Sequence, residues 1–148
     1  MGIKRYTANA DTTITNAYKS NLSTRGTGSN MGRADSMAVF SIYGQESSGS
    51  SELSRMLVNW DIASIATDRS NSVIPASGSV NFYLKMSNAT TPFTLPRDFT
   101  LTVAAVSGAK NSDTNAPIVF NWQEGNGIDM ENYTDVTRDG IGANWINM

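Results

Sequence analysis

The sequence predicts an all-β protein, an antiparallel β-sandwich with jelly-roll-like topology and little helix. Apolar and polar residues alternate over several short stretches, as half-buried strands require. Between these stretches lie segments rich in Gly, Pro, Ser, Asn and Asp, the residues that accept turn geometry. A chain of 148 residues can bury a core without disulfides. We therefore expect one sandwich domain over residues 1–148.

The first half of the chain contains two long strand candidates and two short ones. Residues 35–43 and 53–62 carry apolar side chains at both odd and even positions, which predicts strands covered on both faces. After the second of these, residues 62–68 form either a helical turn capped by Asp61 or Ser64, or an irregular loop. The two short candidates are residues 4–7 and 12–15.

The second half contains the clearest alternation. In residues 79–87, apolar side chains alternate with Asn81, Tyr83 and Lys85, which predicts a strand with one buried and one exposed face. Residues 99–106 repeat the pattern, with two threonines on the polar face. The chain ends on a strand-like stretch without a stop signal, so we expect either a fragment or a continuation into another element. Shorter candidates are residues 118–122 and 143–146.

The composition excludes several chemistries. The chain contains no Cys and no His, which removes thiolate nucleophiles, Ser-His-Asp triads and the commonest transition-metal ligands. Its 13 acidic residues exceed its 11 basic ones, so we expect no nucleic-acid partner. No apolar run is long enough for a transmembrane helix, and the N-terminus lacks the apolar region of a signal peptide. We therefore expect no membrane insertion.

Residues 121–129, NWQEGNGID, form the densest cluster of potential chemistry. Glu124 and Asp129 are candidate ligands for a structural calcium ion, although their spacing does not match an EF-hand loop. The alternatives are a solvated acidic edge or a pair of glycosidase carboxylates across a cleft. The main role that we assign to the stretch is architectural, with Trp122 covering an end of the sandwich and Glu124 bonding turn amides. Apart from calcium, no cofactor is expected.

Three aromatic residues near predicted loops, Trp122, Tyr133 and Trp145, are candidates for glycan contact. Aromatic faces can stack on the apolar side of sugar rings. The alternative is a place in the core. The core is our main expectation for Trp60, which ends an apolar strand, and also for Trp122 and Trp145.

The glycine-rich stretch of residues 25–33, RGTGSNMGR, has only a superficial likeness to a phosphate-binding loop. A dinucleotide-binding fingerprint needs Gly at the place of Met31, and a P-loop needs a Gly-Lys pair. We expect a flexible loop. The alternative is an anion or sugar contact made by its backbone donors.

Four stretches carry a family pattern when they are taken in order. They are ADTTI at residues 10–14, SRMLVNWDI at 54–62, NWQEGNG at 121–127 and ANW at 143–145. Together they resemble the DNRLRE-type β-sandwich domain, which is related to carbohydrate-binding module family 96. The resemblance spans most of the chain and implies a non-catalytic domain found on secreted enzymes, adhesins or virion proteins. The start of the chain, residues 1–21, also looks like the N-termini of fibre or structural proteins of marine bacteriophages.

These resemblances imply a virion structural or adhesive module, namely a phage fibre or capsid decoration protein. Such a protein is made in the host cytoplasm without a signal peptide and is located in the virus particle. Its expected partners are other virion proteins and further copies of itself in a homo-oligomer, with host surface glycans as a further option. The alternative is a carbohydrate-binding module of a larger secreted enzyme or adhesin. We expect no catalytic activity, because the chain lacks His and no spacing places a carboxylate pair in a cleft.

Overall fold

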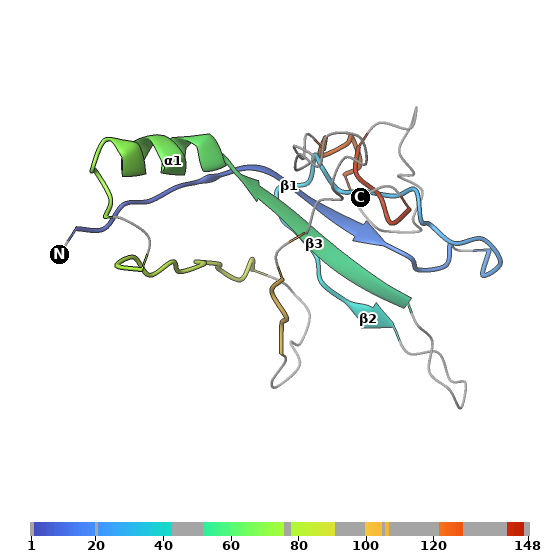
Figure 1. Ribbon diagram of the computed structural model, residues 1–148. Coiled ribbons are helices and arrows are strands. Elements are labelled where there is room, and N and C mark those ends of the chain that lie inside the picture. The colour runs from blue at the N-terminus through green and yellow to red at the C-terminus, as the bar shows by residue number, and fades with distance from the viewer. Residues whose placement is uncertain are drawn as a thin grey trace. The chain divides into compact units, whose positions relative to one another are not determined.

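The computed structural model describes residues 2–19, 21–42, 52–75, 78–90, 100–104, 106, 122–128 and 142–146. The chain divides into two compact units, one formed by Met1–Tyr83 with Trp122–Met148 and the other by Leu84–Asn121. The helices and strands of the described residues all belong to the first unit (Figure 1). They are β1 (Ala8–Thr15), β2 (Ser41–Ile42), β3 (Glu52–Trp60) and α1 (Ile62–Ser70).

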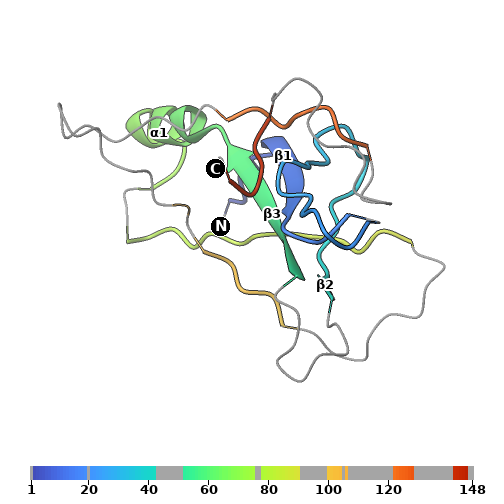
Figure 2. The ribbon, with the colours of Figure 1, turned by 90° about the vertical axis from the view of Figure 1, so that its right-hand side faces the viewer.

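The three strands form one antiparallel sheet in the order β1-β3-β2. β1 pairs with β3 from Ala8 opposite Trp60 to Thr15 opposite Ser54, with an irregularity between Ala8 and Ala10. The short β2 pairs with the start of β3. Figures 1 and 2 show β3 between the other two strands and leading directly into α1. Antiparallel strands with one short helix among the described residues agree with the predicted all-β class.

The core of the first unit is built on β1. Thr12, Thr13, Ile14 and Thr15 have no exposed surface, so both faces of this strand are covered. A buried hydroxyl needs a hydrogen-bond partner, and each of these threonines finds one in the backbone of another segment. Thr12 Oγ1 accepts from Met31 N–H at 3.1 Å, Thr13 Oγ1 accepts from Ala38 N–H at 3.0 Å, and Thr15 Oγ1 donates to Leu53 C=O at 2.8 Å.

The predicted strands of the first half are found in part. The candidates at residues 12–15 and 53–62 correspond to β1 and β3, and Trp60 is half-buried at the end of β3. The candidate at residues 35–43 is described up to residue 42, and within this part only β2 is a strand. Directly before β2, Ser54 N–H still donates to Phe40 C=O at 3.0 Å, whereas Phe40 N–H donates to the hydroxyl of Ser54 at 2.6 Å. The side chain of Ser54 thus takes part in the pairing beyond the end of β2.

The strands predicted for the second half are absent from the described residues. Residues 78–90 and 100–104 form no strand, and the side chains of Phe82, Leu84 and Met86 are between 47% and 63% exposed. Alternation gives a strand an apolar face, but the backbone also needs a neighbouring strand to bond. Residues 142–146 are likewise irregular, whereas the candidate at 118–122 lies outside the described residues except for Trp122.

The stretch that the sequence left open between a turn and a loop is helix α1. Its N-cap is Asp61 rather than Ser64, and the Asp61 carboxylate accepts from Ala63 N–H at 3.0 Å. The hydroxyl and the N–H of Ser64 also donate to this carboxylate, and they hold the pKa of Asp61 below its usual value. A free N–H in the first turn is therefore satisfied by a side chain, as capping requires.

In the part of the chain that the structure describes, no helix has the length and apolar character needed to cross a membrane.

Candidate functional site

Three segments meet beside β1: residues 24–34, 122–128 and 142–146, which we call the junction. Each pair of segments is joined by a backbone hydrogen bond, and both Figure 1 and Figure 2 show the three segments close together. The junction is therefore a closed set of contacts between distant parts of the sequence. The bonds run from Arg33 N–H to Gly127 C=O at 2.9 Å, from Ala143 N–H to Gln123 C=O at 2.7 Å, and from Trp145 N–H to Thr27 C=O at 3.0 Å.

Asn30 lies at the centre of the junction and is completely buried. Its Oδ1 accepts from Gly127 N–H at 3.1 Å, and its backbone forms an antiparallel bridge with Ile14 of β1. A methyl group added at Gly125 would overlap the Asn30 side chain, and one at Gly127 would overlap the Asn30 carbonyl. At Gly142 it would overlap the backbone of Gly125 and the Asn30 side chain. These positions are glycine because the segments approach one another too closely for any side chain.

The junction corrects the prediction that residues 25–33 form a flexible loop. Ser29, Asn30 and Met31 are buried, and Met31 N–H donates to Thr13 C=O at 3.1 Å. The small and polar residues that resemble a loop signal allow this segment to lie directly against β1. The backbone donors of Ser29, Met31 and Arg33 bond protein carbonyls, so they do not form a site for an anion or a sugar.

Glu124 connects the junction to β1. Its Oε1 accepts from Asp11 N–H at 2.9 Å, across 113 residues of sequence. The N–H of Asp11 and the C=O of Thr13 lie on the edge of β1 that does not pair with β3. Unpaired groups on such an edge could bind another strand. Glu124 and Met31 bond the two groups instead. The prediction was that Glu124 bonds turn amides, whereas the amide that it bonds belongs to the distant strand β1.

The other predicted site residues have different outcomes. Trp122 and Trp145 lie in the junction, and both are half-buried. The guanidinium of Arg55, which is exposed on β3, lies 4.4 Å from the centre of the Trp145 ring. Asp129 and Tyr133 lie outside the described residues. Trp145 therefore combines an exposed part with a stacked cation, an arrangement that the sequence did not indicate.

The calcium site and the glycosidase carboxylate pair were both predicted from Glu124 and Asp129. The structure does not test either of them, because Asp129 lies outside the described residues. Within the described ranges, no group of three or more acidic, His or Cys side chains could hold a metal ion. The carboxylate of Glu124 is already a hydrogen-bond acceptor for β1. Any calcium ion at this place would compete with that bond.

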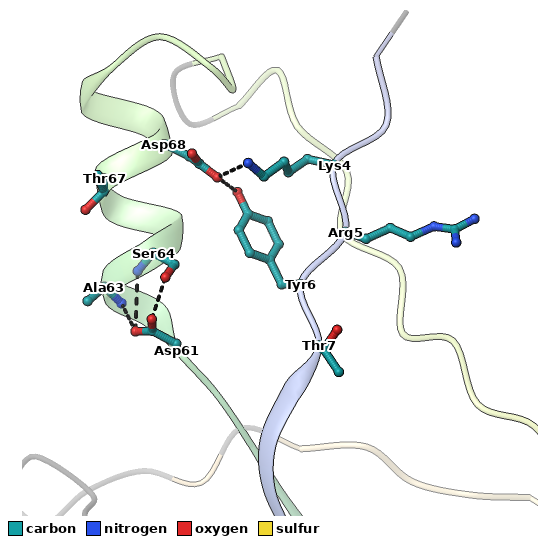
Figure 3. A pocket seen from close by; sticks show the side chains of 9 residues that line it. All are labelled: Lys4, Arg5, Tyr6, Thr7, Asp61, Ala63, Ser64, Thr67 and Asp68. Carbon is teal, nitrogen blue, oxygen red and sulfur yellow. Dashed lines mark hydrogen bonds and ion pairs between the residues drawn. The ribbon is translucent and has the colours of Figure 1, made fainter.

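A second place that gathers polar groups is a groove of about 530 Å³ between residues 4–7 and α1, shown in Figure 3. Lys4 Nζ and the Tyr6 hydroxyl both approach Oδ2 of Asp68, at 3.0 Å and 2.8 Å. Arg5 points away from α1 (Figure 3). The predicted strand at residues 4–7 is thus an irregular segment fixed to the helix by side chains. The only sequence signal for this contact with the helix is the two-residue spacing of Lys4 and Tyr6. In an extended chain this spacing places both side chains on the same side.

Electrostatics in the groove follow from this convergence. The hydrogen bond from Lys4, with a further one from Tyr6, holds the pKa of Asp68 below its usual value. Burial, together with the bond to Asp68, raises the pKa of Tyr6. Asp68 therefore stays ionised and Tyr6 stays protonated at neutral pH, so the contact is a structural clamp.

No protein-family model, no curated protein and no solved structure matches this chain.

We expect Gly125→Ala to destabilise the protein much more than Gly78→Ala. Both glycines have positive φ, +90° and +97°, so alanine is strained at either position by about 1–3 kcal/mol. Only at Gly125 does the added methyl group also overlap a side chain, that of Asn30, which adds about 1–3 kcal/mol of overpacking. The free energy of unfolding in urea measures the difference. Gly2→Ala, with open space around it, is the neutral control, and equal losses at Gly78 and Gly125 would contradict the junction.

We expect acid to weaken the clamp on α1, and Asp68→Asn to remove that pH dependence. Because the pKa of Asp68 is lower in the folded chain, its stabilisation is fully present above the ordinary pKa of aspartate, about 3.9. It is lost as the pH falls through the lower folded value. The stability of the wild type should therefore fall more steeply than that of Asp68→Asn below about pH 4. Unfolding curves of both proteins at several pH values test this. Asp61, whose pKa is also lowered, is present in the wild type and in the variant, so its contribution to the pH dependence cancels in the comparison. Parallel slopes for the two proteins would reject the clamp.

Proposed function

We propose that this protein is a non-catalytic structural or adhesive module of a virus particle, namely a phage fibre or capsid decoration protein. We further propose that its sheet belongs to an antiparallel, jelly-roll-like sandwich. The observation that carries the proposal is that the stretches resembling the DNRLRE-type domain contact one another. Residues 10–14 and 54–62 pair within β1 and β3. Glu124 of the third stretch bonds Asp11 of the first, and Arg55 of the second stacks on Trp145. Mutual contact supports a shared framework, since four unrelated local likenesses would not need to meet.

The N-terminal stretch that looks like phage virion proteins is a folded part of the first unit. Lys4 and Tyr6 bond α1, residues 8–15 are β1, and Tyr18 N–H donates to Oε1 of Glu52 at 2.8 Å. This supports a likeness between folded modules, not only between terminal tails. The proposed location is accordingly the virus particle, where the partners are other virion proteins and further copies of the chain.

The use of the carboxylates supports the non-catalytic part of the proposal. Glu52 and Glu124 accept from backbone N–H groups, Asp61 caps α1, and Asp68 holds Lys4 and Tyr6. General acid–base catalysis needs a carboxyl group that can reach a substrate proton. These four groups are instead committed to holding segments of the chain together.

The oligomeric state tests the virion proposal. A structural module of a particle should form a symmetric oligomer or bind its particle through an interface of about 1,000 Å² or more. Light scattering of the purified protein, over a range of concentrations, should therefore show a closed homo-oligomer. A chain that stays monomeric throughout, and that does not bind purified particles, would contradict the proposal.

A second candidate function, glycan binding, is favoured by Trp145. This could serve a host-binding adhesin or, as the alternative, a carbohydrate-binding module of a larger secreted enzyme. The ring of half-buried Trp145 contacts the guanidinium of Arg55, and the backbone N–H of Trp145 donates to Thr27 C=O at 3.0 Å, so both contacts restrict the movement of this aromatic residue. Fixed aromatic rings are suited to sugar stacking, because they lose little entropy on binding.

We expect selective binding on a glycan array that weakens at least about tenfold with Trp145→Ala, a loss of about 1.4 kcal/mol. Tyr83→Ala is the matched control, because Tyr83 is an 87% exposed aromatic residue outside the junction. Unfolding curves of both variants separate lost binding from lost folding. Absence of any selective glycan, or equal weakening by both substitutions, would reject this function without affecting the oligomer test.

A further inference from the structure

Residues 122–128 of the junction contain Asn126-Gly127, the only Asn-Gly pair in the sequence. Asn126 is exposed, whereas Gly127 is buried. In such a pair the backbone nitrogen of glycine can reach the side-chain carbonyl carbon of asparagine, because no Cβ hinders its approach. We propose that Asn126 is a deamidation site that the junction keeps unreactive, and that it reacts when residues 122–128 separate from Asn30.

The reaction needs only water as a co-reactant. Gly127 N forms a bond to Cγ of Asn126 and gives up its proton, the Cγ–Nδ2 bond breaks, and Nδ2 leaves as ammonia. The product is a five-membered succinimide ring. Water then opens the ring at one of its two carbonyls and yields aspartate or isoaspartate. One amide is hydrolysed overall, and no oxidant or reductant is consumed.

The junction occupies the attacking nitrogen. Gly127 N–H donates to Asn30 Oδ1 at 3.1 Å, and Gly127 C=O accepts from Arg33 N–H at 2.9 Å. Ring closure requires the nitrogen to give up the proton that it donates to Asn30. Gly127 also lies so close to the Asn30 carbonyl that a methyl group on its Cα would overlap the carbonyl oxygen. The closed junction therefore opposes the reaction through these bonds and through the lack of space around Gly127.

The product affects how the junction closes again. Either product carries a negative charge at exposed position 126. Isoaspartate also adds one methylene to the main chain, which changes the position of Gly127 relative to Asn30 and Arg33. Conversion to isoaspartate would therefore be a permanent record of an opening that led to reaction, independently of the proposed function.

The test compares two rates in the intact wild-type chain. Peptide mass spectrometry follows conversion of Asn126 at neutral pH in the folded protein and in urea, and hydrogen exchange follows the Gly127 amide in the same folded sample. We expect folded Asn126 to react at least about tenfold more slowly than in urea, an opening free energy of about 1.4 kcal/mol or more. The factor by which folding slows deamidation of Asn126 should agree with the factor by which it slows exchange of the Gly127 amide. Both processes need the same opening of the junction. Asn126→Gln is the control. Its longer side chain would have to close a six-membered ring, so the reaction product assigned to Asn126 should be absent from this variant.

Two variants extend the test. Glu124→Gln weakens the bond to Asp11 and should speed deamidation and hydrogen exchange by the same factor. Asn30→Ala, where it folds, should do so more strongly; where it does not fold, Glu124→Gln decides. Equal deamidation of the wild type with and without urea would overturn the proposal. So would deamidation in the folded chain that is faster than amide exchange permits, or a variant in which exchange rises and deamidation does not.

Discussion

Burial of the threonine hydroxyls of β1 is the constraint on which the rest of the first unit depends. Leaving one such group without a partner costs about 1–3 kcal/mol, so every segment beside this strand must offer a donor or acceptor at a defined place. Three segments do so, through Met31, Ala38 and Leu53. Directional bonds fix the register of neighbours more narrowly than apolar contact, which is roughly proportional to area and has no direction. This explains how the described part of the unit, in which few large apolar side chains are buried, has a defined arrangement around β1.

The junction extends the same logic outward from β1. Asn30 and Glu124 are polar, and each uses its side chain to bond a backbone N–H of a distant segment. The glycines around Asn30 allow the segments to approach closely enough for these bonds. Trp145 belongs to this set of contacts through its backbone N–H, which donates to Thr27 C=O, and its ring contacts the guanidinium of Arg55. For the proposed role in binding, these contacts are favourable, because a surface that is ordered before binding loses less entropy.

Local signals in the sequence predicted part of this structure well. The strands at residues 12–15 and 53–62 follow from side-chain pattern. For residues 62–68 the sequence left open a helical turn or a loop, with Asp61 or Ser64 as the cap, and the structure has a helix capped by Asp61. The partners of Asn30 and Glu124 could not be predicted, because they lie 97 and 113 residues away along the chain. Alternation at residues 79–87 showed which side chains share a face but could not supply a neighbouring strand. Local pattern therefore indicated elements, while the site arises from contacts between elements.

The order in which the chain is synthesised gives the clamp on α1 a further consequence. None of the nine residues of α1 is buried, and a helix of this length is marginal on its own in water. The ribosome makes Lys4 and Tyr6 more than sixty residues before their common acceptor, Asp68. Until Asp68 is made, residues 4–6 lack this partner, and α1 gains the support only when they contact it. A change in the residues directly before Lys4 would therefore act on α1 as well.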